Sequence, residues 1–382
     1  MPDDQRKGSL GGEISPLLLA AGAGAVGAWL WWRGRNTQLL PTSNTMSGRV
    51  CVVTGANAGV GKATATALAQ RGAHVVLACR NDQKAAAACD DIRRKVPGAA
   101  VEALPLDLSS IESIRGFVEL FRKTNRPLHV LVNNAGIIQG EPALVRGMEK
   151  SMVVNHLGPF LLTSLLLPDL QKSAAGGQEG GSPAPPASRI VNVGSRLEKR
   201  GSLWAAAAES DAASGAAAIP PGARWFYPPP GKAHHAFQLY GSSKLCNQLC
   251  TYELDRRLRA QAAKAAAVAA AAAGGGKGRM VTANIVTPGV VNTGLGDGTT
   301  SPWISWAAPL LKGAFMRTVE KGAETVVWAA SSPEVEEIGG GKFFGDMAEV
   351  PSSDASRDEN LARMVWEASE LASGLEESER VV

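Results

Sequence analysis

The 382-residue sequence is poor in the features on which several protein classes depend. Its five cysteines are odd in number and show no CxxC spacing, which argues against a disulfide scaffold or a zinc site and favours a reducing compartment. The sequence has no Lys/Arg-rich run and a net charge of only +4, so we expect no nucleic-acid partner. An apolar share of 45% nevertheless predicts a folded protein with a substantial core.

Charge is missing from one stretch near the amino terminus, residues 14–32. A helix of this length nearly spans a hydrocarbon core of about 30 Å. Three tryptophans crowd its carboxyl end, where indole rings prefer the membrane interface, and Arg33 and Arg35 follow. The competing interpretations are a buried helix of a soluble protein and a cleaved signal peptide. We favour a tail at 1–13, a single-pass transmembrane anchor at 14–32 and a linker at 33–47.

The positive-inside rule places the remaining chain on the cytoplasmic side of that membrane, because the arginines follow the anchor. We expect the endoplasmic reticulum, with the chloroplast envelope as the alternative. Inside the anchor, residues 22–27 spell GxGxxG, the dinucleotide fingerprint. The acidic residue that this motif needs about 20 positions later is missing, since the next one is Asp82. We interpret these glycines as small residues of a membrane helix.

A second glycine-rich turn has the context that the first lacks. An apolar strand is predicted at 49–54, the turn TGANAGVG occupies 54–61, and an alanine-rich helix follows to residue 71. A strand, a glycine turn and a helix N-terminus together form a binding site for the pyrophosphate of a dinucleotide. Taken alone, the motif is also compatible with a purely structural turn.

An acidic residue is also missing at the end of the next predicted strand, His74–Cys79, where Arg80 stands instead. A carboxylate there would bind the ribose hydroxyls of NAD, whereas an arginine can pair with the 2′-phosphate of NADP(H). We therefore expect NADP(H) as the cofactor. The strand predicted at 101–106 ends at Asp107, which is placed to meet the adenine edge.

Predicted strands alternate with helices at a spacing of about 25 residues in the cofactor half. This alternation predicts an α/β fold, a Rossmann-like doubly wound parallel sheet in a single domain, with right-handed crossovers. The predicted strands are 49–54, 74–79, 101–106, 128–132, 189–194 and 280–286.

Tyrosine is scarce, and of the three in the chain only Tyr240 is followed four residues later by a lysine, Lys244. At this spacing the two side chains lie on the same face of a helix. A lysine ammonium beside a phenol favours the phenolate, so we expect a lowered pKa for Tyr240 and a role in acid–base catalysis. Taken alone, an ordinary exposed pair is the more common explanation of such a spacing.

Several motifs follow one another in a fixed order: TGANAGVG at 54–61, NNAG at 133–136, Asn155, Ser195, YGSSK at 240–244 and PGVVNT at 288–293. With this ordered set the sequence resembles the short-chain dehydrogenase/reductase family over residues 48–346. Within the family the resemblance is greatest to the retinol dehydrogenase group, whose members are often membrane-anchored and prefer NADP(H).

The resemblance implies a proton relay and a set of cofactor contacts. Tyr240 would exchange a proton with the substrate oxygen, Lys244 would lower the tyrosine pKa and hold the nicotinamide ribose, and Ser195 would hydrogen-bond the substrate oxygen. Asn155 would orient a water that links Lys244 to solvent. The implied cofactor-binding residues are Gly55, Asn57, Gly59, Val60, Gly61, Arg80, Asp107, Asn133, Tyr240, Lys244, Pro288 and Thr293.

We therefore expect an NADP(H)-dependent oxidoreductase that interconverts a lipophilic alcohol and its aldehyde or ketone, with a homodimer as one arrangement. The alternatives are a pigment-pathway double-bond reductase and a non-catalytic NADP-binding scaffold. The predicted domain spans 48–350, followed by a solvated helical tail at 351–382, and an apolar lid is expected at 302–311. Low-complexity insertions are expected at 173–188, 200–235 and 260–278, and the second contains His234 and His235 and is expected to contact substrate.

Overall fold

The computed structural model describes residues 46–139, 143–175, 187–203, 226, 236–271, 281–291 and 316–381. The chain divides into two units, 1–39 and 40–382, and every described residue belongs to the second. The predicted membrane anchor, the predicted lid, His234, His235 and Thr293 all lie outside the described residues.

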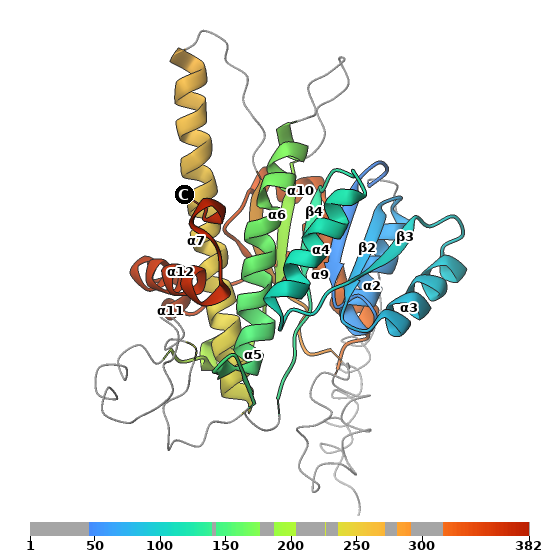
Figure 1. Cartoon of the computed structure of the whole chain (residues 1–382), viewed down its shortest axis with the longest axis horizontal. Coiled ribbons are helices and arrows are strands. Elements are labelled where there is room, and N and C mark those ends of the chain that lie inside the picture. Colours follow the sequence, from blue (N-terminus) through green and yellow to red (C-terminus); the bar gives the residue numbers. More distant parts are fainter. Residues whose placement is uncertain are drawn as a thin grey trace, which may run out of the picture. The chain divides into compact units, whose positions relative to one another are not determined.

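The second unit is built on an eight-stranded sheet with the order β10-β9-β8-β7-β4-β1-β2-β3 (Figure 1). All neighbouring strands are parallel except β9 and β10. The predicted doubly wound parallel sheet is confirmed, and most predicted strand limits hold within one or two residues. The strands are β1 (Val50–Thr54), β2 (His74–Cys79), β3 (Val101–Pro105), β4 (Val130–Asn133), β7 (Arg189–Val193), β8 (Thr282–Thr287), β9 (Phe343–Gly345) and β10 (Ala348–Glu349).

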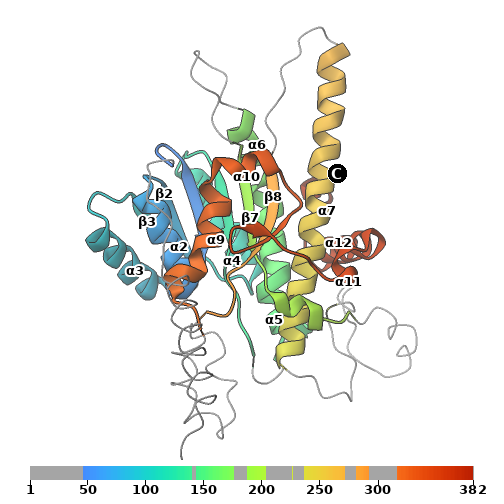
Figure 2. The same ribbon diagram turned by 180° about the vertical axis from the view of Figure 1, so that it is seen from behind.

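Helices cover both faces of the sheet, because successive side chains of each strand point to opposite sides and both sides are apolar. In β1, Val50 and Val52 belong to one hydrophobic core and Cys51 and Val53 to the other. The first core contains side chains of α4 (Ile111–Lys123), α6 (Gly158–Ala175), α7 (Ala236–Ala271) and α12 (Glu359–Ser373), and the second those of α2 (Gly59–Gln70), α3 (Asp82–Lys95) and α9 (Val319–Ser331). Figure 2 shows α2 and α9 on the face opposite to α6.

Short elements connect this framework. They are the hairpin strands β5 (Leu144–Val145) and β6 (Met148–Glu149), α5 (Lys150–Met152), the π-helical turn η1 (Val153–Leu157), the 3-10 turns η3 (Arg196–Arg200) and η7 (Glu377–Glu379), α10 (Pro333–Ile338) and α11 (Asp354–Arg357). The predicted long helix at 146–170 therefore begins later than expected and contains a π turn.

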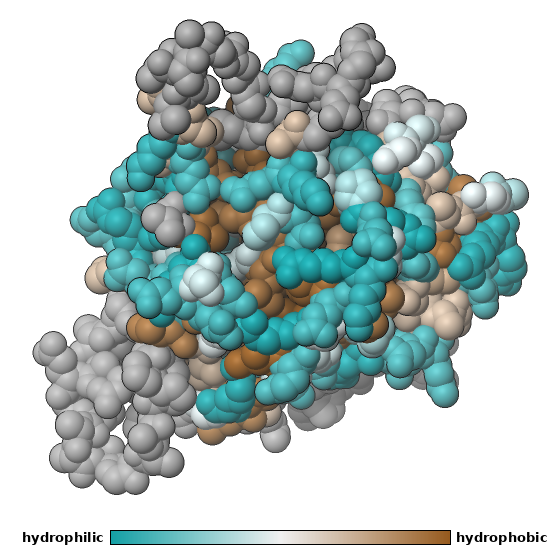
Figure 3. All heavy atoms as spheres, turned by 45° about the horizontal axis from the view of Figure 1, so that its top comes forward, coloured by the Kyte–Doolittle hydropathy of each residue, from teal (hydrophilic) through white to brown (hydrophobic). Residues whose placement is uncertain are grey.

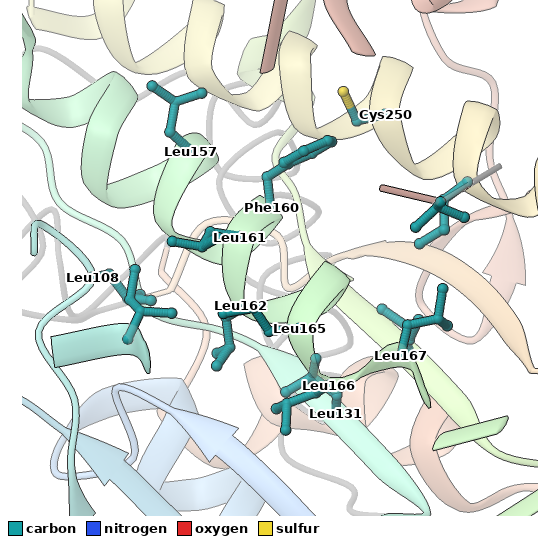
Figure 4. Close-up of a cluster of buried hydrophobic side chains, with 14 of the residues drawn as sticks. Leu108, Leu131, Leu157, Phe160, Leu161, Leu162, Leu165, Leu166, Leu167 and Cys250 are labelled. Atoms are coloured by element: carbon teal, nitrogen blue, oxygen red, sulfur yellow. The ribbon is translucent and has the colours of Figure 1, made fainter. Parts of the chain in front are cut away.

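Residues 150–175 are long and apolar enough to cross a membrane, but 89% of their most apolar window is buried inside the protein. Figure 4 shows why: Leu162 and Leu166 lie on the side of α6 that faces Leu131 of β4, and Phe160 points toward Cys250 of α7. Burial on all sides is typical of a core helix. On the face shown in Figure 3 the surface is mostly polar, and apolar residues are visible mainly in the recesses between polar ones.

The prediction of a surface loop at 260–278 was wrong for residues 260–271, because α7 continues to Ala271. Alanine is the strongest helix former, so an alanine run that follows a helix extends it. The prediction of a solvated helix at the carboxyl end was wrong about its surroundings. One face of α12 is buried in the core, and Trp366, only 2% exposed, packs edge-on against Phe160 with ring centroids 4.8 Å apart.

The other two predicted insertions are described only in part. Residues 173–175 belong to α6, and 176–186 lie outside the described residues. In the segment 200–235, Phe226 is fully buried, and its ring lies 5.6 Å from that of His156. All five cysteines are buried as free thiols: two lie in β1 and β2, one lies on α3 and two lie on α7.

Candidate active site

A cavity of about 600 Å³ lies at the carboxyl ends of the central parallel strands. This is where ligands bind in open α/β sheets, because the loops that leave the strands diverge there. Most of the predicted site residues line it: Gly55, Asn57, Gly59, Val60, Gly61, Arg80, Asp107, Ser195, Tyr240, Lys244 and Pro288.

The glycine turn at one end of the cavity requires glycine for two separate reasons. Gly55 and Gly59 have φ angles of +64° and +54°, which side chains disfavour. A Cβ on Gly61 would lie 2.3 Å from Nδ2 of Asn134 and 2.5 Å from the carbonyl oxygen of Gly55. The turn thus leads directly into α2, whose N-cap Ala58 has no side-chain hydrogen bond and whose first turn has no acidic residue. Such a helix N-terminus favours an anion.

Only some of the residues expected to bind the adenosine part of the cofactor lie at the cavity. Arg80 is exposed at the end of β2, and the Asp107 carboxylate accepts hydrogen bonds from the backbone N–H and hydroxyl of Ser109 at 2.9 and 2.6 Å. Asn133, in contrast, does not line the cavity. Its side-chain amide donates to Thr163 and Asn192, both at 2.8 Å, so it links β4 to α6 and β7.

The Tyr240–Lys244 pair lies at the other end of the cavity, on the first turns of α7. Both side chains are buried, at 7% and 3% exposure, and the Tyr240 hydroxyl hydrogen-bonds Ser195, which follows β7. The Lys244 ammonium donates to the carbonyl oxygen of Val193 at 2.7 Å, and it lies 5.4 Å from the centre of the Tyr240 ring. The fold thus gathers three predicted relay residues from two segments of the chain.

The expected lowering of the Tyr240 pKa was wrong for this structure. Burial raises the pKa of Tyr240 to about 12, and the Ser195 hydrogen bond offsets this only in part. Lys244 does not counter the effect, because its ammonium is directed at Val193. Burial also lowers the pKa of Lys244 to about 8. Desolvation disfavours the charged form of each group, and here it exceeds the attraction between them.

Asn155 lies in the π turn η1 and is 1% exposed. Its side chain clamps the segment after β4, accepting from the Ile137 N–H at 2.7 Å and donating to the Ile137 carbonyl at 2.9 Å. It also donates to Ser243 at 3.1 Å. A Cβ on Gly136 would lie 3.5 Å from Asn155 Oδ1 and 3.6 Å from Lys244 Nζ, so Gly136 separates the two side chains. π turns frequently occur at functional sites.

Comparison with known proteins agrees with this geometry. The model of the short chain dehydrogenase family matches residues 49–207. Human retinol dehydrogenase 14 is 34% identical over 346 residues, covering 86% of this chain and 88% of the relative. Mouse polyprenol dehydrogenase is 34% identical over 351 residues, covering 91% of each chain. The chain belongs to the short-chain dehydrogenase/reductase family.

A solved structure of an uncharacterised protein from Mycobacterium Paratuberculosis shares the fold, with a TM-score of 0.56 and 26% identity over 88% of this chain and 96% of the other. As a family member, the chain is an oxidoreductase acting on CH–OH donors with a nicotinamide cofactor. The cavity fits such a cofactor, because it is lined by the glycine turn and by the N-terminus of α2, which favours an anion such as a pyrophosphate.

Two functional features were missed in the sequence. Asn134, the second residue of NNAG, lines the cavity and donates to the Thr54 carbonyl at 2.9 Å. It therefore holds the first residue of the glycine turn in place. Its position beside Asn133 was the available signal. Ser242 hydrogen-bonds the backbone of Ser202 in both directions, at 3.1 and 2.9 Å, and so ties the segment after Ser195 to α7. No local pattern marks that contact.

Proposed function

We propose that the protein is an NADP(H)-dependent dehydrogenase/reductase that interconverts a lipophilic alcohol and its aldehyde or ketone. The observation that carries the proposal is the composition of one cavity. Tyr240, Lys244 and Ser195 line it together with the glycine turn and Arg80. A proton donor, a cation and an oxygen-binding hydroxyl are the groups that carbonyl reduction requires.

In this proposal the cofactor, when bound, supplies the hydride that is added to or taken from the substrate carbon. The Tyr240 hydroxyl gives its proton to the substrate oxygen during reduction and takes it back during oxidation. Its raised pKa keeps it protonated and therefore ready to donate at neutral pH. Ser195 donates a hydrogen bond where negative charge develops on that oxygen. Lys244 would hold the ribose hydroxyls of the cofactor and would be the proton source that restores Tyr240 after reduction. Asn155 holds the segment beside Lys244.

The lipophilic substrate class is supported by relatives named for retinol and for polyprenol. An anchor at residues 14–32 fits the same idea, because such substrates dissolve in membranes. The cytoplasmic orientation, the membrane, the apolar lid at 302–311 and the homodimer stay predictions.

Replacement of the Tyr240 hydroxyl tests the proposal. We expect Tyr240→Phe to lower kcat by at least about 10²-fold while NADPH binding is retained, because only the proton donor is removed. Turnover is measured as NADPH oxidation with a panel of retinal, long-chain aldehydes and ketones. Tyr252→Phe is the matched control, since the Tyr252 hydroxyl lies on the same helix but bonds Gln248 and Ser352 outside the cavity. Full activity of Tyr240→Phe contradicts the proposal.

The cofactor preference is tested at Arg80. An arginine–phosphate contact contributes about 1.5–3 kcal/mol, so Arg80→Asp should weaken NADPH binding by roughly 10- to 100-fold and leave NADH binding less affected. The dissociation constants for NADPH and for NADH are measured by fluorescence titration. Arg94→Asp, at an exposed position on α3 outside the cavity, controls for the change in charge. Equal losses for the two cofactors would rule out the assigned role of Arg80.

A further inference from the structure

A chain of buried and partly buried hydrogen bonds connects the carboxyl-terminal helix α12 to Asn155. The side-chain amide of Asn247 on α7 donates to the backbone carbonyl of Asn155 at 2.8 Å. The Asn247 side-chain oxygen lies 3.0 Å from Nδ1 of His156, and Nε2 of His156 lies 2.8 Å from the hydroxyl of Ser369 on α12. Ser369 and His156 are 213 residues apart in the sequence.

The local sequence removes the usual α-helical partner of the Asn155 carbonyl. In a regular helix it would accept a hydrogen bond from the N–H four residues later. That residue is Pro159, which has no N–H. The helix is π-helical over Val153–Leu157, so its backbone follows another hydrogen-bonding pattern there. The Asn247 amide therefore contributes to the position of Asn155 from outside the helix.

The chemistry of the groups fixes the direction of the chain. Because the Asn247 nitrogen donates to Asn155, its oxygen faces His156, and His156 must carry a proton on Nδ1 to bond it. Neutral His156 then accepts through Nε2, and the Ser369 hydroxyl is the donor within reach, although the Val365 carbonyl is a second acceptor for the same proton. The opposite tautomer would place a ring lone pair against the Asn247 oxygen. Turning the Asn247 amide would only move this repulsion to the Asn155 carbonyl.

Burial keeps His156 in this neutral form. The His156 side chain is 1% exposed and Ser369 is fully buried. Removal from water lowers the pKa of His156 to about 4, although its bond to Asn247 acts in the opposite direction. The ring is therefore neutral near pH 7. The Ser369 hydroxyl also donates to the Val365 carbonyl at 2.6 Å, so its single proton is shared between that oxygen and Nε2 of His156.

We propose that Ser369, His156 and Asn247 are positioning residues for Asn155, so that α12 supports the active site rather than only the core. The inference rests on the proposed role of Asn155 beside Lys244. Loss of one donor in the chain lets Asn247 turn, which displaces the Asn155 carbonyl and with it the side-chain clamp on Ile137. Gly136, which separates Asn155 from Lys244, precedes Ile137 directly.

The first test compares two serines of the same helix in the full-length protein. Ser369→Ala should lower kcat by roughly 10- to 100-fold with no change in KM for NADPH, because small displacements of positioning groups have effects of this size. Ser373→Ala is the matched control, since Ser373 is also buried but, within the described part of the chain, its hydroxyl bonds only Glu370 of its own helix. Turnover is measured with NADPH and retinal or, if retinal is not reduced, the fastest aldehyde of the panel. Equal kcat values for the two variants would overturn the inference.

The second test does not depend on turnover or on the folding of a variant. The ring-nitrogen shifts of His156 in the wild-type protein, measured by ¹⁵N NMR, should be those of the Nδ1–H tautomer between about pH 6 and 8, which is well above the pKa of about 4 at which the ring becomes charged. Finding the Nε2–H tautomer would overturn the chain as drawn. Tyr240→Phe separates the two proposals: if it is inactive while Ser369→Ala is fully active, the relay stands and the positioning role does not.

Discussion

The cofactor half and the catalytic half of this protein are stabilised in different ways. In the cofactor half, from β1 to β4, the glycine turn packs against Asn134, and both belong to motifs that are visible in the sequence. In the catalytic half, side chains far apart in the sequence hold the reacting groups: Ser369 contacts His156, and Ser353 donates to the buried Glu198 in the turn after Ser195. The first half can be recognised from short motifs, whereas the second depends on tertiary contacts.

The largest effect that tests this difference between the two halves is expected at Trp366, in the catalytic half. We expect Trp366→Ala to lower the free energy of unfolding by about 3–5 kcal/mol, because a buried aromatic side chain leaves a cavity. The ring packs on Phe160, and its N–H donates to Glu370 at 2.7 Å. Chemical denaturation measures the change. Met364→Ala on the same helix, at a position 45% exposed, should change stability by less than about 0.5 kcal/mol. A small effect at Trp366 would mean that α12 is dispensable.

The two halves should also differ in their response to acid. His156 and His129 both have a pKa lowered to about 4, mainly by burial. Between pH 4 and 6.5 the unfolded chain then binds more protons than the folded one, so stability should rise with pH in that window. For the fully buried ring of His156, a pKa lowered from 6.5 to about 4 corresponds to a difference of about 3 kcal/mol in the free energy of unfolding across this window.

We therefore expect His156→Gln to remove more of this pH dependence than His129→Gln, because His129 is only half-buried and its charge is partly solvated. Unfolding free energies at pH 4.5 and 7 measure both effects. Equal changes in the two variants would show that the catalytic half is not the more desolvated one.

The smallest of the three effects is expected in the cofactor half. Gly61→Ala places a methyl group against Asn134 and Gly55, and overpacking of this kind costs about 1–3 kcal/mol. NADPH affinity, measured by fluorescence titration, should fall with it, because the turn must open. Gly116→Ala on α4, where a Cβ meets nothing within 4 Å, should leave affinity unchanged and stabilise the helix slightly. Unchanged affinity in Gly61→Ala would mean that the turn adapts freely.

The cofactor half could be predicted from the sequence more completely than the catalytic half. Glycine spacing and strand alternation predicted β1, β2 and the turn between them, because these signals are local. Asn133 was assigned to the cofactor by its motif, yet its amide bonds Thr163 and Asn192, residues that the motif does not contain. The Tyr240 pKa was predicted in the wrong direction because spacing reports the distance to Lys244 and not the loss of water around both groups. The environment of α12 depends on partners on α6 and α7, which charge patterning along one helix cannot identify.

The reactivity of the five buried thiols depends on local unfolding of the protein. Burial raises the pKa of every one of them, Cys51, Cys79, Cys89, Cys246 and Cys250, so the reactive thiolate is scarce while the fold is closed. Cys51, Cys79 and Cys89 lie in the cofactor half, and Cys246 and Cys250 lie on α7. The order in which an alkylating reagent labels the five cysteines in native buffer would therefore show which half unfolds locally first, without any engineered probe.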